Sequence, residues 1–184
     1  MFEVRFHGRG GQGAVTAANI LAVAAFKEGH HSQSFPFFGV ERRGAPVQAF
    51  TRIDNEPINL RMNVYTPDAV VVLDPSLLEV INVTDGLKKD GTIIMNTSKK
   101  PSDYDFDFKV ATVDATSIAI SHGLGSSAAP IVNTAILGAY SKAIKNVGID
   151  SIADAIIERA PAKKEINAKA AKEAYQKTIL GWEK

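Results

Sequence analysis

A glycine-rich turn near the start of the chain constrains the fold more than any other feature. Residues Phe2 to His7 alternate between apolar and polar side chains, as a β-strand does, and the run Gly8-Arg9-Gly10-Gly11-Gln12-Gly13 follows at once. The alanine-rich segment from Ala14 to Lys27 then has the composition of a helix, and Gly29 stands where a helix ends. This arrangement leaves backbone N–H groups unpaired beside the positive end of a helix dipole, which favours an anion.

The sequence argues against NAD and ATP as the ligand of this turn. Gly8, Gly10 and Gly13 match the G-x-G-x-x-G spacing, and Arg9 adds a cation beside them. An NAD fold also needs an acidic residue that closes the second strand, and the segment from His30 to Phe38 contains none. The lysine of a Walker motif is absent after the last glycine. We therefore predict a less specific anion site, and one alternative stays open, namely that the glycines only allow close packing of helix against strand.

Composition narrows the class of protein. The 184 residues are enough for one domain with a substantial core, so we predict a single domain over residues 1–184. A net charge of +1 gives no basic field for a nucleic acid, and the absence of cysteine excludes disulfides, cysteine-bound iron–sulfur clusters and a thiol nucleophile in this chain. The first residues form no apolar leader and no stretch is long and apolar enough for a membrane, so a cytoplasmic protein is expected.

The order of predicted elements indicates an α/β fold. Continuous apolar runs, such as residues 69–73 and 92–96, are typical of parallel strands buried on both faces. Further strands are predicted over residues 30–38, 47–53 and 109–114, and helices over residues 115–121, 131–145, 152–159 and 163–176. Alternation of strands and helices followed by closing helices predicts a three-layer α/β/α fold with a mostly parallel, Rossmann-like sheet and extra C-terminal helices.

Two neighbouring segments are candidates for binding. Arg42 and Arg43 lie in a polar, glycine-punctuated loop and could join Arg5 and Arg9 in a cationic rim around the glycine turn. Just before them, the run Phe35-Pro36-Phe37-Phe38 is core, a protein interface or a wall under an adenine ring, and the interface is favoured.

Other polar residues are predicted to be structural. The four histidines are dispersed without partners at metal-ligand spacing, so no metal site is predicted. Ser121 and His122 are adjacent on a predicted helix and point apart, which argues against a hydrolase pair. Asp74 and Asp114 each follow a buried strand and precede a helix, so both are predicted helix caps. Asn133-Thr134 is either a cap or a contact to the glycine turn, and the cap is favoured.

Four stretches together resemble the gamma subunits of the 2-oxoacid:ferredoxin oxidoreductases, the family that includes pyruvate:ferredoxin oxidoreductase. The stretches cover residues 4–13, 35–46, 68–75 and 133–139, and the segment Lys163-Lys164-Glu165-Ile166-Asn167 also fits. The resemblance implies a multisubunit enzyme that decarboxylates a 2-oxoacid on thiamine diphosphate, passes electrons through iron–sulfur clusters to ferredoxin and transfers the acyl group to coenzyme A. The chain itself has neither cysteine nor a Gly-Asp-Gly motif for magnesium and thiamine diphosphate, so those cofactors are expected on alpha, beta and delta-type partner subunits.

The resemblance also sharpens the interpretation of the glycine turn. We expect Gly8, Gly10, Gly11, Gln12 and Gly13 to receive the phosphates of coenzyme A, with charge from Arg9, Arg42 and Arg43 and no catalytic residue in this chain. Three alternatives stay open: the turn contacts another subunit, the chain is an assembly scaffold without a ligand, or it is a free oxidoreductase domain that binds NAD or a flavin. Pyruvate is favoured as the 2-oxoacid because it is the commonest case.

Overall fold

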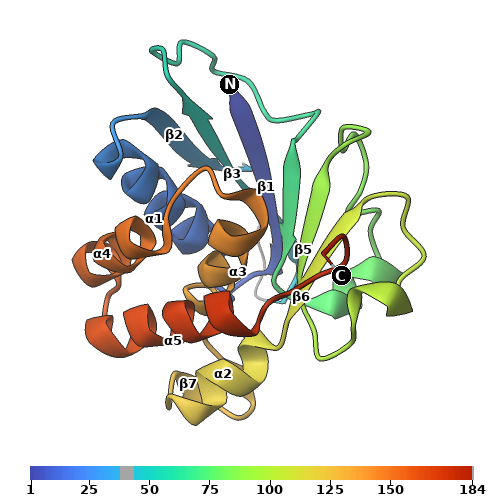
Figure 1. Cartoon of the computed structure of the whole chain (residues 1–184), viewed down its shortest axis with the longest axis vertical. Helices are drawn as coiled ribbons and strands as arrows, with labels where there is room; N and C mark the ends of the chain where they lie inside the picture. The colour runs from blue at the N-terminus through green and yellow to red at the C-terminus, as the bar shows by residue number, and fades with distance from the viewer. Residues whose placement is uncertain (38–43, 184) are drawn as a thin grey trace.

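A seven-stranded sheet forms the centre of the computed structural model, which describes residues 1–37 and 44–183 (Figure 1). The strand order is β2-β3-β1-β4-β5-β6-β9. Parallel pairing joins β1 to β4, β4 to β5 and β5 to β6, whereas β3 and β9 run antiparallel to their neighbours. The bounds are β1 (Phe2–Arg9), β2 (His31–Pro36), β3 (Pro46–Asp54), β4 (Ala69–Val72), β5 (Thr92–Asn96), β6 (Lys109–Val113) and β9 (Ile179–Leu180).

Four α-helices cover one face of this sheet (Figure 1). They are α1 (Ala14–Lys27), α3 (Ala135–Ile144), α4 (Ile149–Arg159) and α5 (Lys164–Lys177). The apolar sides of α1 and α3 pack on the sheet side chains that point the same way, including Phe6, Val71 and Ile94, and α4 and α5 pack on these two helices in the same continuous core. A shorter helix, α2 (Ala115–Ser121), follows β6 at the carboxyl edge of the sheet. The predicted bounds of α1 and α2 are confirmed residue for residue.

The opposite face has a thinner cover. Val70, Val72, Ile93 and Met95 pack there against the 3-10 helix η1 (Pro75–Glu79) and irregular segments, and a second 3-10 helix, η2 (Pro101–Asp103), contacts β6. The α/β class, the mostly parallel sheet and the closing helices are confirmed. Within the described residues, however, the second outer layer consists of 3-10 helices and irregular segments.

Three local differences from the predicted elements affect the site. The strand beside β1 is the antiparallel β3, so β2 lies at the sheet edge and not next to β1. Helix α3 begins four residues later than predicted, after a small hairpin of β7 (Gly125–Ser126) and β8 (Ala129–Pro130). The two-residue strand β9 was not predicted, since its length gives no periodicity. Among the described residues, no helix is long and apolar enough to cross a membrane.

Candidate functional site

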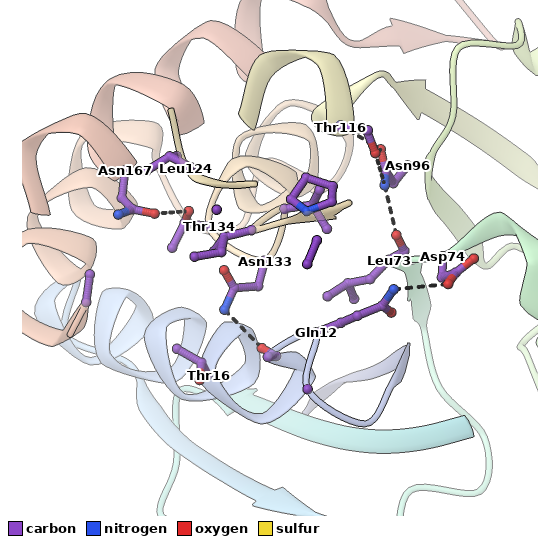
Figure 2. Close-up of a pocket in the computed structure, with 18 of the residues that line it drawn as sticks. Gln12, Thr16, Leu73, Asp74, Asn96, Thr116, Leu124, Asn133, Thr134 and Asn167 are labelled. Carbon is purple, nitrogen blue, oxygen red and sulfur yellow. Dashed lines mark hydrogen bonds between the residues drawn. The ribbon is translucent and has the colours of Figure 1, made fainter. Parts of the chain in front are cut away.

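A cavity of about 680 Å³ lies at the carboxyl ends of β1, β4 and β5. In open α/β sheets this edge is where ligands bind. The glycine turn, Gly8–Gly13, contributes Gly10 to Gly13 to its wall, and Leu73 and Asp74 follow β4 beside them. Figure 2 shows the side chains of Asn133, Thr134 and Asn167 on the far side of the same space. We call this space the turn cavity.

Three helix N-termini meet at the turn cavity. Its wall includes the residues that precede α1, α3 and α5, namely Gly13, Thr134 and Lys163. None of these three positions provides a side chain that caps its helix. At α1, the backbone N–H groups of residues 14–16 have no acceptor within the described part of the chain. Unpaired N–H groups and three helix dipoles together make the cavity attractive to an anion without any concentration of formal charge.

Asn133 connects the glycine turn to the start of α3. Its Nδ2 donates a hydrogen bond to the carbonyl oxygen of Gly13 across 3.3 Å, although 120 positions separate the two residues (Figure 2). Gly13 has a φ of 80°, and a Cβ added there would overlap Asn133 Nδ2. The favoured prediction that Asn133-Thr134 caps its helix is therefore wrong, and the alternative contact to the turn is confirmed for Asn133. Thr134 instead donates to Asn167 Oδ1 at 2.6 Å.

The free end of the Asn133 amide adds a polar group to the wall. Asn133 is 6% exposed, and its Oδ1 has no hydrogen-bond partner within the described residues. Because Nδ2 is committed to Gly13, the oxygen is the atom left over. An unpaired buried acceptor destabilises the fold, which makes it a ready partner for a ligand that carries an N–H or O–H group.

The predicted residues of the turn separate into two groups. Gly10, Gly11, Gln12 and Gly13 line the cavity. Gly8 does not, because it is buried at the end of β1, where an added Cβ would touch Ala14 and Leu73 at 3.5 and 3.8 Å. For Gly8 the structure therefore favours the close-packing interpretation.

Arg9 lies beside the turn, but its guanidinium does not line the cavity. Nε donates to Asp74 Oδ2 at 3.1 Å, Nη1 to the carbonyl oxygen of Gly44 at 3.1 Å, and Nη2 to Ser76 Oγ at 2.7 Å. Arg5 is buried and donates to His7 and to the carbonyl oxygens of Val83 and Asp85. Both arginines thus donate to protein acceptors, and neither lines the turn cavity, so the cationic rim stays a prediction.

The remaining predicted cations lie outside the described residues. Arg42 and Arg43 belong to residues 38–43, so their place relative to the cavity stays a prediction. Lys163, which the sequence analysis did not single out, lies on the cavity wall and donates through Nζ to the carbonyl oxygen of Gly123 at 2.6 Å. The only signal for it in the sequence was its place in the stretch that fits the family.

The structure also places several other residues that the sequence singled out. Phe35 packs on Phe50, with ring centroids 5.2 Å apart, and Phe37 is 43% exposed; neither lines the turn cavity, so they form no adenine wall there. Asp114 caps α2 as predicted, through Ser117 N at 2.8 Å. Ser121 donates to the carbonyl oxygen of Ile118. No group of three or more potential metal ligands occurs in the part of the chain that the structure describes.

The sheet order also disfavours the usual dinucleotide mode. In that mode an acidic residue at the end of the strand next to β1 binds the ribose hydroxyls. Here β3 occupies the place beside β1 and runs in the opposite direction. Its carboxyl end therefore lies next to the amino end of β1, away from the glycine turn. The ribose contact therefore has no counterpart among the described residues next to the turn.

Comparisons with known proteins are consistent along the whole chain. A family model described as pyruvate ferredoxin/flavodoxin oxidoreductase matches residues 3–177. The pyruvate/ketoisovalerate oxidoreductases common subunit gamma of Thermococcus kodakarensis is 58% identical over 186 residues, with 98% of each chain covered. The pyruvate synthase subunit PorC of Methanocaldococcus jannaschii is 55% identical over 180 residues, covering 97% of this chain and 98% of the relative.

Solved structures show the same architecture. The crystal structure of pyruvate oxidoreductase subunit PORC from Thermotoga maritima has a TM-score of 0.83 and 35% identity, with 98% of each chain covered. A 2-oxoglutarate:ferredoxin oxidoreductase from Magnetococcus marinus, with 2-oxoglutarate, coenzyme A and succinyl-CoA bound, has a TM-score of 0.74. At 17% identity this likeness concerns the fold alone, and it covers 95% of this chain but 30% of that one.

Proposed function

The chain belongs to the pyruvate ferredoxin/flavodoxin oxidoreductase family, and from this premise we propose that its turn cavity receives the phosphate part of coenzyme A. The chain is a gamma-type subunit of a multisubunit 2-oxoacid oxidoreductase. The complete enzyme oxidatively decarboxylates the 2-oxoacid, reduces ferredoxin and forms an acyl-CoA. Pyruvate is the proposed 2-oxoacid, with ketoisovalerate second, since the T. kodakarensis relative is common to both oxidoreductases.

The division of labour follows from what this chain contains. It has no cysteine for an iron–sulfur cluster, so electrons must pass through alpha, beta and delta-type partners to ferredoxin. Thiamine diphosphate and magnesium are also assigned to those partners, because this chain has no Gly-Asp-Gly motif to hold them. This chain is left with binding and assembly rather than with redox chemistry.

The meeting of three uncapped helix N-termini at one cavity is the observation that carries the proposal. Phosphate oxygens accept hydrogen bonds and are stabilised by helix dipoles, so they match unpaired N–H groups. The pantetheine arm and the adenine of coenzyme A carry N–H groups, for which Asn133 Oδ1 is a matching acceptor. Apolar side chains such as Leu73 and Leu124 complete the wall.

A charge placed inside the cavity tests this proposal. Thr16 is half-buried on the cavity wall, in the first turn of α1, where an aspartate is favourable for a helix. Thr16→Asp should therefore leave the fold intact but weaken coenzyme A binding at least about tenfold, because two like charges a few ångströms apart repel by more than 1 kcal/mol. Isothermal titration of coenzyme A into the assembled enzyme measures the effect.

Val15→Asp is the matched control, because Val15 is 42% exposed in the same helical turn and does not line the cavity. It adds the same charge to the same helix end. Equal affinity of both variants and the unchanged enzyme would contradict coenzyme A binding in the turn cavity. If Thr16→Asp instead lowers recovery of the complex while Val15→Asp does not, the cavity contacts another subunit and the chain acts in assembly.

A further inference from the structure

The carboxylate of Asp74 lies at the junction of the glycine turn and η1. Its Oδ2 accepts from Arg9 Nε at 3.1 Å and from Gln12 Nε2 at 3.0 Å (Figure 2). Its Oδ1 accepts from the backbone N of Ser76 at 3.0 Å and from Ser76 Oγ at 2.7 Å. One side chain therefore connects two residues of the turn to the segment that follows β4, and it does more than the helix cap that the sequence predicts.

Gln12 transmits this anchor into the backbone of the turn. While its Nε2 donates to Asp74, its Oε1 accepts from the backbone N of Arg9 at 2.7 Å. The amide side chain thus bridges the two ends of the turn, and the Gln12 backbone N closes it by donating to the carbonyl oxygen of Arg9 at 2.9 Å. With the bridge in place, the N–H groups of residues 14–16 at the start of α1 have no acceptor in the described part of the chain, beside the cavity wall that Gly13 and Thr16 form.

Asp74 also balances the charge of Arg9. Each of the three guanidinium nitrogens of Arg9 has one protein acceptor, and the ion pair is partly shielded, with 29% and 19% of the two side chains exposed. Burial alone would raise the pKa of Asp74, but hydrogen bonds from Ser76 and Gln12 and the charge of Arg9 outweigh it and lower the pKa. The carboxylate is therefore ionised at neutral pH, and three of the five N–H groups of the Arg9 guanidinium are engaged within the protein.

We infer that Asp74 is a positioning residue of the turn cavity: through Gln12 and Arg9 it holds the glycine turn in the shape that presents backbone N–H groups to the ligand. The inference rests on the proposed function for the identity of the ligand. It also assigns Arg9 to the support of the turn and removes it from direct contact with phosphate, so backbone donors supply the selectivity.

Asp114 offers a matched comparison within the same chain. Like Asp74, it follows a buried strand and caps the next helix, with Oδ1 accepting from Ser117 N at 2.8 Å and Oδ2 from Ser117 Oγ at 2.7 Å. Unlike Asp74, it has no hydrogen bond to the glycine turn in the described part of the chain. Asn in place of either aspartate removes one charge and weakens one cap, and only at Asp74 does it also disturb Gln12 and Arg9.

Two readouts on Asp74→Asn and Asp114→Asn test the inference. We expect coenzyme A to bind the assembled Asp74→Asn enzyme about tenfold more weakly, and the Asp114→Asn enzyme as tightly as the unchanged one. In amide spectra of the full chain, Asp74→Asn should move the signals of Gly10, Gly11 and Gly13, and Asp114→Asn should not. If Asp74→Asn does not fold, Gln12→Met removes the bridge, leaves the cap of η1 in place and should give the same two changes.

The outcomes separate this inference from the proposed function. Unmoved turn signals in Asp74→Asn overturn the positioning role whether or not coenzyme A binds. Tighter binding by Asp74→Asn overturns it as well, because it would mean that a released Arg9 contacts the phosphate. If Asp74→Asn moves the turn signals but the unchanged enzyme fails to bind coenzyme A, the positioning of the turn is supported and coenzyme A is refuted as its ligand.

Discussion

Replacing Gly138 with alanine is expected to destabilise the chain by about 3 kcal/mol. Gly138 is buried in α3 where that helix crosses α5, and an added Cβ would overlap the carbonyl oxygen of Ala171 and lie 2.8 Å from the backbone N of Tyr175. Both opposing atoms are backbone, so no rotamer change relieves the overlap and the helices must move apart. The better helix propensity of alanine offsets only about 1 kcal/mol of this loss. Urea unfolding of the two chains gives the difference directly.

The nature of the opposing atoms provides the control for this prediction. Because the overlap at Ala171 involves its carbonyl oxygen and not its methyl group, Ala171→Gly should fail to restore stability in the Gly138→Ala background. Full recovery in the double variant would show that side-chain packing, rather than the approach of the two backbones, determines the spacing of α3 and α5. An unchanged or higher unfolding free energy in Gly138→Ala alone would contradict the close crossing.

Local patterns were sufficient for much of the fold. The continuous apolar runs of β4 and β5 and the alanine-rich composition of α1 identified these elements because each depends on its own residues. The antiparallel course of β3 beside β1 could not be read in the same way, since a strand has the same alternation whichever neighbour it pairs with. The three-layer prediction placed α-helices on both faces of the sheet because it rested only on the alternation of strands and helices along the chain. The second face is instead covered by 3-10 helices and irregular segments.

The site shows the same division between local and distant information. The glycine turn was recognisable because its spacing is local, and Asp114 was correctly predicted as a cap because a cap contacts residues two or three positions away. Asn133 and Asp74 were misjudged in part for the opposite reason: their decisive partners, Gly13 and Gln12, lie 120 and 62 positions away. A cap motif and a long-range contact use the same residue types, so only the fold distinguishes them.

Acid should destabilise the chain through His7, with a loss of several kcal/mol between neutral pH and about pH 3. His7 is 1% exposed, and its Nε2 accepts from Arg5 Nε at 2.9 Å, so the proton is on Nδ1. Burial, and secondly the charge of Arg5, lower the pKa of His7 to about 3. An unfolded chain protonates this histidine below about pH 6.5, and the folded chain does not until pH is near 3. Between these values the unfolded state binds the extra proton, so the unfolding free energy falls by about 1.4 kcal/mol per pH unit.

The interval from about pH 6.5 to about 4.5 isolates this contribution, because most carboxylates begin to titrate only below it. His7→Gln keeps an acceptor for Arg5 without a titratable ring, and its unfolding free energy should be nearly flat across that interval. His31→Gln, at the exposed start of β2, removes a histidine without touching Arg5 and should keep the full slope. Urea unfolding at several pH values measures all three chains. A slope that persists in His7→Gln would place the acid-sensitive group elsewhere, whereas its loss would assign the acid sensitivity to the protonation of His7, in the strand that leads into the glycine turn.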